Sequence, residues 1–225
     1  MKPFVFINVA ASVDGKISNE RRVQLRISSK EDMERVDRLR AESDAIMVGI
    51  GTVLADNPRL TVKSEELRKK RVLEGKPENP LRVVVDSRAR IPEDALILND
   101  EAETLLAVSK KAELDRLKKL QERAMIFVSG EDRVDLRELM EFLYHIGVRR
   151  LMVEGGGELI ASLFREGLVD EIYVYYGNMI IAGKNSPTIA DGESLDEPAE
   201  LELLEVKKLG SGILTRWKVK RKRFN

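Results

Sequence analysis

Residues 151–160 read Leu-Met-Val-Glu-Gly-Gly-Gly-Glu-Leu-Ile. An apolar run typical of a buried strand leads into one carboxylate, three glycines and a segment with helical apolar spacing. Glycines remove every Cβ where the strand gives way to the helix, so a ligand can approach the bare backbone, and the N–H groups and dipole of the helix N-terminus favour an anion. A tight turn alone would need one glycine or two. Three glycines after a carboxylate therefore favour a phosphate-bearing ligand on an α/β scaffold.

Apolar runs of strand length recur along the chain, and several are continuous rather than alternating, as expected for strands buried on both faces. The runs cover residues 4–9, 45–48, 81–85, 104–108, 125–128, 150–153, 171–176 and 213–219, with a weaker one at 201–206. Helical patterns cover 114–121 and 157–166, and two more begin at the capping sequences Ser28-x-x-Glu31 and Asp135-x-x-Glu138. This alternation predicts an α/β fold with a mixed, mostly parallel sheet flanked by helices.

The end of the chain departs from this alternation. The last three strand-like runs follow one another without a convincing helix, and residues 209–212, Leu-Gly-Ser-Gly, suit a hairpin turn. We therefore expect antiparallel C-terminal strands. The charged stretch 64–76 is interpreted as an insertion or an exposed excursion of the chain at the surface. It is not interpreted as a linker between domains, because strand-like segments of the same character lie on both sides of it. The sequence predicts a single domain over residues 1–225.

Composition argues against several classes of site. The chain has 39 basic and 39 acidic residues, so it offers no overall field that would attract nucleic acid or an anionic membrane. It has no cysteine and one histidine, His145, which excludes thiolate chemistry and makes Ser–His triads and histidine-rich metal sites poor hypotheses. No segment reaches the ~20 apolar residues of a membrane span, and Asn8 interrupts the apolar start. We expect a soluble, intracellular protein that needs no metal.

A second glycine cluster follows another strand-like run. Residues 49–59 read Gly-Ile-Gly-Thr-Val-Leu-Ala-Asp-Asn-Pro-Arg, which lacks the third glycine of a dinucleotide fingerprint because Leu54 stands there. Small residues after a strand still allow a close backbone approach, and Thr52 supplies a hydroxyl near a helix start. The Asp-Asn-Pro turn lets Arg59 and Lys63 face a ligand. An ordinary strand–turn–helix is the alternative.

Polar residues also follow the apolar run at 81–85. Residues 83–88 read Val-Val-Val-Asp-Ser-Arg, which places polar groups just beyond a buried strand. In open α/β sheets, ligands bind at this edge. Arg88 is a candidate to pair with a ribose 2′-phosphate, which would favour NADP over NAD. A solvated loop explains this segment nearly as well.

The first strand-like run carries a fourth candidate segment. Residues 8–16 read Asn-Val-Ala-Ala-Ser-Val-Asp-Gly-Lys. The small side chains at 10–12 stand where a packed strand would prefer bulk, which suggests a flat ligand against the backbone. Asn8 is an amide in a buried strand, so it must find hydrogen-bond partners. Taken alone, it is a satisfied core asparagine.

Together these segments resemble the reductase family of riboflavin biosynthesis, which shares a dihydrofolate-reductase-like fold. The resemblance spans roughly residues 4–190, and the combination of motifs is far more specific than any one of them. The matching stretches are Asn8, 12–16 (Ser-Val-Asp-Gly-Lys), 27–29, 39–41, 48–61, 85–87, 154–157, 168–171 and Gly183.

This resemblance implies an NADPH-dependent reductase. Members of the family reduce the ribosyl group of a pyrimidine ribosylamine 5′-phosphate to a ribityl group, with hydride transfer to the sugar C1′. Motif position and similarity assign two groups of residues to the cofactor side. The first group is Thr52, Asp56, Val85, Asp86, Ser87 and Arg88; the second is Gly155 with the segment Gly156–Ser162, which contains Gly157 and Glu158. The substrate side then comprises Arg40, Arg59, Leu60, Lys63 and Glu154.

Two departures from the bifunctional bacterial relatives matter. Those enzymes carry a zinc deaminase domain with His and Cys ligands, whereas this chain has no cysteine, so we expect no deamination. The chain therefore resembles the stand-alone archaeal and fungal type, which reduces the still-aminated diaminopyrimidinone. Asn8 stands where the bifunctional enzymes have lysine, and Lys63 where they have arginine. Glu154 and Asn8 are the candidate catalytic positions. Because an amide transfers no proton, proton transfer falls to Glu154 or a bound water.

Three alternatives stay open at this point. The chain could reduce the deaminated 5-amino-6-(5-phosphoribosylamino)uracil, or it could be a dihydrofolate- or pteridine-type reductase of the same fold. It could also be a non-catalytic nucleotide-binding protein. The resemblance further implies a cytoplasmic homodimer whose partner molecule is a pyrimidine ribosylamine phosphate, with neither nucleic acid nor membrane involved.

Overall fold

The computed structural model describes residues 1–23 and 25–220. Its residues group into two compact units, Met1–Pro3 with Asp37–Met152, and Phe4–Val36 with Val153–Asn225. Two of the three boundaries fall inside regular elements, the helix α1 (Lys30–Glu42) and the strand β6 (Arg150–Val153), and the third lies between Pro3 and Phe4. The expectation of a single domain stays a prediction.

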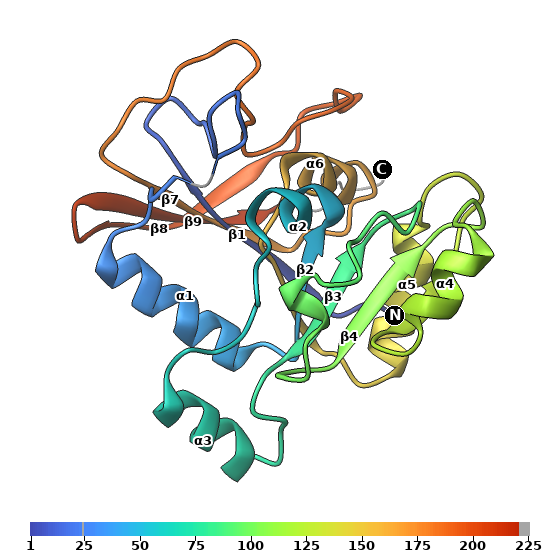
Figure 1. The fold of residues 1–225 in the computed structure, drawn as a ribbon. Coiled ribbons are helices and arrows are strands. Elements are labelled where there is room, and N and C mark those ends of the chain that lie inside the picture. The colour runs from blue at the N-terminus through green and yellow to red at the C-terminus, as the bar shows by residue number, and fades with distance from the viewer. Residues whose placement is uncertain (24, 221–225) are drawn as a thin grey trace. The chain divides into compact units, whose positions relative to one another are not determined.

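The first unit is built on parallel strands in the order β5-β4-β3-β2. Figure 1 shows β2, β3 and β4 side by side, with α4 and α5 next to them. The strands are β2 (Ala45–Gly49), β3 (Leu81–Val85), β4 (Thr104–Val108) and β5 (Met125–Val128). The helices are α2 (Ile50–Asp56), α3 (Glu65–Leu73), α4 (Leu114–Leu120) and α5 (Leu136–His145), with a 3-10 turn at Leu96–Leu98.

Continuous apolar runs form the core of this unit, as the sequence predicted. Side chains in the middle of three neighbouring strands are 0% exposed, which is typical of parallel strands buried on both faces. They include Ile46, Met47, Val83, Val84, Leu105 and Leu106. The predicted cap of α5 is confirmed, because the Asp135 carboxylate accepts hydrogen bonds from the backbone N–H groups of Arg137 and Glu138.

The second unit has the strand order β1-β7-β9-β8. β1 (Phe4–Ala11) runs parallel to β7 (Glu171–Tyr176), and β9 (Gly212–Val219) is antiparallel to both β7 and β8 (Leu201–Leu209). Residues 210 and 211 form the two-residue turn between β8 and β9. The unit also holds α6 (Gly157–Arg165), after which the chain turns at Gly167 with φ +64°.

These elements confirm the predicted fold class: a mixed, mostly parallel arrangement with helices and antiparallel C-terminal strands. The stretch 64–76, expected as an exposed excursion, contains α3, capped by the Ser64 hydroxyl and supported by the Lys69–Glu65 pair at 2.6 Å. One local expectation was wrong. The cap of α1 lies one residue later than predicted, because the Ser29 hydroxyl accepts from the Asp32 N–H at 3.3 Å. Within the described residues, no helix is both long and apolar enough to cross a membrane.

Candidate functional site

The glycine run joins the end of β6 to the start of α6. Gly155 has φ +113°, a conformation that L side chains rarely adopt, and its peptide bond to Gly156 is cis. Gly156 is the N-cap residue of α6 with extended backbone angles. The predicted strand–glycine–helix motif is therefore confirmed as a local structure. Gly155 is required by its backbone angle whether or not a ligand binds.

Position 157 requires a glycine because another segment of the second unit approaches its backbone closely. A Cβ at this position would lie 2.7 Å from the Thr188 carbonyl oxygen and 2.8 Å from Asp191 Oδ2. The Asp191 N–H also donates to the Gly157 carbonyl at 3.1 Å, and the Asp191 carboxylate accepts from the Thr188 N–H and hydroxyl. The close approach at Gly157 is thus made by residues 188–191. The backbone angle of Gly155 and this contact of Gly157 account for those two glycines, and the phosphate role predicted for Gly156 stays a prediction.

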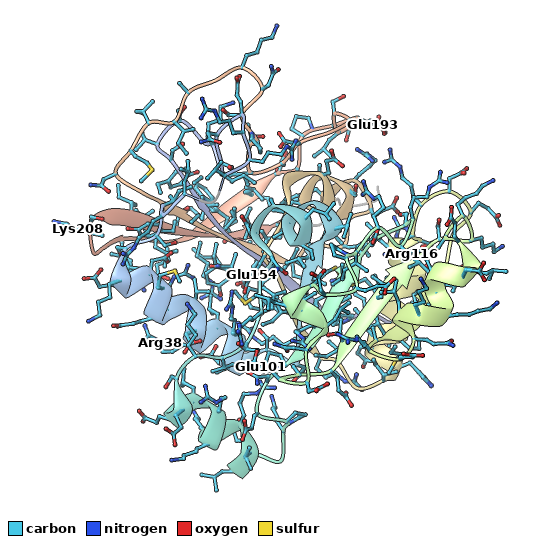
Figure 2. All side chains as sticks on the ribbon, in the orientation of Figure 1. Arg38, Glu101, Arg116, Glu154, Glu193 and Lys208 are labelled. Atoms are coloured by element: carbon cyan, nitrogen blue, oxygen red, sulfur yellow. The ribbon has the colours of Figure 1, made fainter. Side chains whose placement is uncertain are left out.

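The N-terminus of α6 retains the properties of an anion site. This nine-residue helix begins after Gly156, whose lack of a side chain leaves no side-chain oxygen to cap the first turn. Glu158 is exposed in that turn, and its carboxylate favours the helix dipole but would repel a phosphate. If Glu158 takes part in cofactor binding, it does so through its backbone N–H. Glu154 follows β6 directly and is half-buried (Figure 2).

Two loops of the second unit, residues 12–20 and 179–191, pack together beyond the ends of β1 and β7. Val13 N–H donates to the Met179 carbonyl and Ile17 N–H to the Pro187 carbonyl, both at 2.9 Å. In Figure 1 these segments appear as the dark-blue and orange loops on the same side of the unit. We call them the paired loops. The sequence singled out residues 12–16 and, in the second loop, Gly183 alone, because the second loop has no regular pattern.

Asp14 joins the paired loops through its carboxylate. It accepts hydrogen bonds from the Ser12 hydroxyl at 2.6 Å, the Ala182 N–H at 2.8 Å and the Ile181 N–H at 3.1 Å. The Ser12 hydroxyl, followed by these backbone donors, lowers the pKa of Asp14 from 3.8 to about 2. Because the paired loops also contact Gly157, Asp14 belongs to the framework that positions the glycine run.

Asn8 lies in β1 with 7% of its surface exposed, and its amide has the partner that the sequence required. Arg35 Nη2 donates to Asn8 Oδ1 at 2.7 Å, and Arg35 is ion-paired with Asp32 at 2.7 Å. Asp32 in turn accepts from the Ser28 hydroxyl at 2.6 Å. On the same helix, Met33 is 42% exposed while Asp32 and Arg35 are buried. The i, i+3 spacing of the two opposite charges was the available signal.

In the first unit, the predicted cofactor residues Thr52 and Asp56 both lie on α2. Thr52 is half-buried and Asp56 is exposed, although desolvation by the surrounding chain raises the pKa of the Asp56 carboxyl. Asn57 ends the helix with φ +41° and accepts a hydrogen bond from the Leu96 N–H at 2.8 Å. The strand–turn–helix expected at 45–57 is therefore present, and its ligand-binding role stays a prediction.

The segment 59–63 is fastened to α1 in the part of that helix that belongs to the first unit. Asp37 accepts from the Lys63 N–H at 2.7 Å, and Arg40 Nη1 donates to the Thr61 carbonyl at 3.1 Å. The structure thus brings together Arg40, Leu60 and Lys63, three predicted substrate residues. Leu60 is 3% exposed with φ +50°, so its backbone rather than its side chain is available to a ligand.

Arg59 is directed elsewhere. Its Nη1 lies 2.9 Å from Glu101 Oε1, and both side chains are about half exposed. The Arg59 guanidinium, which was predicted to bind the substrate, is therefore already paired with a carboxylate. Lys63, in contrast, is held by its backbone, and its side chain is exposed.

Among residues 85–88, only Arg88 is exposed. Asp86 is 0% exposed and accepts from the Ile91 N–H at 2.8 Å, and burial raises the pKa of its carboxyl. Ser87 accepts at its hydroxyl from the Val134 N–H at 3.1 Å. Asp86 therefore organises the turn after β3, and direct contact of its carboxylate with a cofactor does not fit this burial. Val85 is half-buried at the end of β3.

Metal binding has no visible site in the part of the chain that the structure describes. No group of three or more His, Cys, Asp or Glu side chains is placed there to hold an ion. The described site features are a glycine-opened helix N-terminus, exposed cations and one half-buried carboxylate. Taken separately, the helix N-terminus of the second unit suits a phosphate group, and the exposed cations of the first unit suit a phosphate group as well.

Comparison with known proteins agrees with these features. Residues 3–215 match the model of the RibD C-terminal domain. The chain belongs to the RibD C-terminal domain family. A relative from Archaeoglobus fulgidus, named 2,5-diamino-6-ribosylamino-4(3H)-pyrimidinone 5′-phosphate reductase, is 61% identical over 212 residues, which are 94% of this chain and 96% of that protein.

A second relative of the same name, from Methanothermobacter thermautotrophicus, is 46% identical over 223 residues, or 98% of this chain and 100% of that protein. Among solved structures, a pyrimidine reductase-like protein from Corynebacterium diphtheriae has a TM-score of 0.87 with 19% identity and covers 98% of this chain and 93% of its own. At this identity, the likeness shows the fold alone. Membership in the RibD C-terminal domain family confirms the resemblance proposed from the sequence motifs.

Proposed function

We propose that this protein reduces the ribosyl side chain of 2,5-diamino-6-ribosylamino-4(3H)-pyrimidinone 5′-phosphate to the ribityl form with NADPH. The observation that carries this proposal is the 61% identity, over nearly the full length of both chains, with the reductase of that name. Bound NADPH supplies a hydride. The sugar C1′, in its ring-opened imine form, accepts the hydride while the imine nitrogen gains a proton.

The residues of the chain fit such a cofactor. Gly156 and the first N–H groups of α6 suit a pyrophosphate, because no Cβ at Gly156 blocks its approach. Arg88 is an exposed cation beyond β3, where it would pair with the 2′-phosphate that distinguishes NADPH from NADH. Thr52 and Ser87 contribute hydroxyl groups, and Asp56 lies at the end of the same helix as Thr52.

The substrate 5′-phosphate would be held by Arg40 and Lys63. Lys63 is held by the hydrogen bond from its N–H to Asp37, and Arg40 lies on α1 with its Nη1 donating to the Thr61 carbonyl, so both residues are positioned before a ligand arrives. Each contributes a charge-assisted hydrogen bond to a dianion. Glu154 would orient the sugar hydroxyls and stabilise the positive charge that develops on the iminium. Asn8 acts, in this proposal, as a hydrogen-bonding group with no proton transfer of its own.

The proposal includes a homodimer in the cytoplasm and excludes nucleic acid, membrane and metal from the reaction. The other reductase substrates and a non-catalytic nucleotide-binding role are the competing hypotheses. Identity above 60% with a named reductase favours the enzyme over the binder. It favours the aminated substrate over the deaminated one for the same reason.

Substrate-dependent NADPH oxidation tests the proposal. We would follow the loss of NADPH absorbance when the purified protein is mixed with the aminated ribosylamine phosphate, its deaminated form or dihydrofolate. Each assay is run in the presence and absence of EDTA. The aminated compound should give the highest kcat/KM, with no effect of EDTA. A higher value for either other compound would replace the proposed substrate. No oxidation with any compound, while NADPH still binds, would favour the nucleotide-binding protein.

A further inference from the structure

The polar network around Asn8 includes a guanidinium nitrogen without a partner. Arg35 is 8% exposed, and its Nη1 atom is buried and makes no hydrogen bond to any residue that the structure describes. Asp32, which is 1% exposed, neutralises the guanidinium at 2.7 Å. Burying an N–H group without a partner is costly, so an arginine of this kind calls for an explanation beyond folding. Residues that break such a rule are typical of functional sites.

Each hydrogen bond of this network has a fixed direction. The Ser28 hydroxyl donates to Asp32 Oδ2 at 2.6 Å, and Arg35 Nε donates to Asp32 Oδ1 at 2.9 Å. A guanidinium only donates, so the Asn8 atom that lies 2.7 Å from Arg35 Nη2 has to be the amide oxygen. Rotating the amide by half a turn would place its NH2 group against another donor. The network therefore determines which end of the Asn8 amide faces Arg35.

The other end of the Asn8 amide is the Nδ2 group. Within the described part of the chain Nδ2 has no hydrogen-bond partner, and unlike Arg35 Nη1 it is not sealed from solvent. An amide NH2 group can only donate. The charge-assisted bond at Oδ1 polarises the amide, which makes Nδ2 a stronger donor. Asn8 therefore presents a hydrogen-bond donor to a ligand.

The strand β1 leaves room for a ligand on one side of Asn8. Side chains two residues apart in a strand point to the same face, so Phe6, Asn8 and Ala10 share one face of β1. Phe6 is 0% exposed, and its ring lies 5.6 Å from the ring of Tyr173, measured between centroids. Ala10 is half-buried and carries only a methyl group. A ligand therefore reaches Asn8 from the Ala10 side.

We propose that Arg35 is a positioning residue of the reductase, which fixes Asn8 as a hydrogen-bond donor to an acceptor oxygen of the pyrimidinone substrate. Arg35 does not touch the ligand itself, because its free nitrogen is buried, and it acts through Asn8. The inference rests on the proposed function for the identity of the ligand and adds the polarity of one contact. A carbonyl oxygen fits at Asn8, whereas an amino group that donates does not. A pyrimidinone carries such an oxygen on a flat ring, which suits the small side chain of Ala10.

Asn8→Asp tests the polarity of this contact. The carboxylate keeps an oxygen for Arg35, but it has no N–H group to donate to a ligand. Calorimetric titration of the full chain with the aminated ribosylamine phosphate, in the absence of NADPH, measures affinity apart from turnover. Kd should rise at least tenfold, while Tm stays close to that of the parent. An unchanged Kd would overturn the proposal, because an oxygen at position 8 would then serve the ligand as well as the NH2 group does.

Arg35→Lys tests whether Arg35 acts through Asn8. Lysine keeps the positive charge but loses the planar guanidinium that orients the amide. Kd for the substrate should rise in Arg35→Lys, and the same change should have no further effect in an Asn8→Ala background. Arg71→Lys is the matched control, because Arg71 is 2% exposed and donates to backbone carbonyls around the end of α1. This control should lower Tm without changing Kd.

Several outcomes would overturn the positioning role. Additive effects of Arg35→Lys and Asn8→Ala on Kd, or equal changes in Arg35→Lys and Arg71→Lys, would make Arg35 a structural residue only. A loss of NADPH affinity in Asn8→Asp with unchanged substrate affinity would place the acceptor oxygen on the cofactor. A parent protein that binds the substrate but does not oxidise NADPH with it would contradict the proposed reaction alone, since the comparison of Kd values still applies. A parent that does not bind the substrate would overturn both proposals.

Discussion

Asn8 in β1 and Arg35 in α1 share a 2.7 Å hydrogen bond from Arg35 Nη2 to Asn8 Oδ1. This bond links a strand to a helix through two buried polar side chains, and Arg35 also pairs with Asp32, whose side chain is 1% exposed. The Nη1 atom of Arg35 is buried and has no hydrogen-bond partner within the described part of the chain. The network is therefore held by few contacts, and each of them matters to the stability of the second unit.

Asp32→Ala should destabilise the protein strongly. It removes the carboxylate that neutralises a buried guanidinium, and breaking a buried pair in this way costs about 3–5 kcal/mol. Urea denaturation measures the change. Glu65→Ala is the control, because the Lys69–Glu65 pair is about 70% exposed on both sides and should contribute less than about 1 kcal/mol. Equal losses in the two variants would contradict the importance of the Asn8–Arg35–Asp32 network.

The stability that Asp14 gives to the paired loops should decrease in acid. The pKa of Asp14 falls from 3.8 to about 2 on folding, so the folded state binds its proton less readily than the unfolded state. Its contribution to stability is therefore fully present above pH ~4 and is lost as the pH falls toward 2. Thermal melting of the parent and of Asp14→Asn across this range measures the effect. The difference in Tm between them should be largest near pH 5 and should shrink toward pH 2; a constant difference would contradict it.

Substitutions at two positions of the glycine run should have different effects, one on folding stability and the other on NADPH binding. Gly157→Ala pushes a Cβ against the Thr188 backbone and should cost about 1–3 kcal/mol of stability. Gly156→Ala should leave the melting temperature much closer to that of the parent and should instead weaken NADPH binding. Calorimetric titration with NADPH and thermal melting of both variants make the comparison. Tight NADPH binding by Gly156→Ala would contradict the phosphate role of this position.

Lys63→Ala should raise KM for the phosphorylated substrate roughly ten- to a hundredfold, with a smaller change in kcat, because one charge-assisted contact of about 1.5–3 kcal/mol is lost. The segment should keep its structure, since Lys63 is anchored to Asp37 by its backbone N–H. Arg59→Ala is the control, because its guanidinium is paired with Glu101. A dephosphorylated substrate should abolish the difference between Lys63→Ala and the parent. If Arg59→Ala has the larger effect, the phosphate lies on that side.

Glu154→Gln should lower kcat markedly while NADPH binding and Tm stay close to those of the parent. The amide still accepts hydrogen bonds, but it lacks the charge that stabilises an iminium. Single-turnover kinetics and thermal melting distinguish this role from a purely structural one. A retained kcat with a lowered Tm would make Glu154 a helix-capping residue.

The sequence predicted the strands well because their apolar runs are continuous. Eight of the nine runs begin at the predicted residue, and β3, β4, β5, β6 and β7 match at both ends. It could not reveal that Arg82, inside one of these runs, is 0% exposed with its guanidinium bonded to Thr104 and Asn99. Those partners lie 17 and 22 residues away in the chain, so no local pattern identifies them.

The candidate site was predicted as a set of segments rather than as a geometry. Periodicity and glycine clusters located β6, α6 and the turn after β3. They did not show that Gly157 is required by a close contact with residues 188–191. They also did not show that Asp86 is committed to its own turn. Such assignments depend on which chain segment lies opposite, and that is a property of the three-dimensional fold.

The parallel pairing of β1 with β7 has a consequence for how the chain is made. Phe6 pairs with Glu171, so the first strand to leave the ribosome must wait for more than 160 further residues before this partner is synthesised. The strands β2, β3 and β4 each pair with the next strand along the chain, so the four strands from β2 to β5 can assemble during that interval. The apolar residues of β1 stay exposed for most of translation. A nascent chain halted before β7 would therefore be a natural client for a chaperone that shields apolar segments.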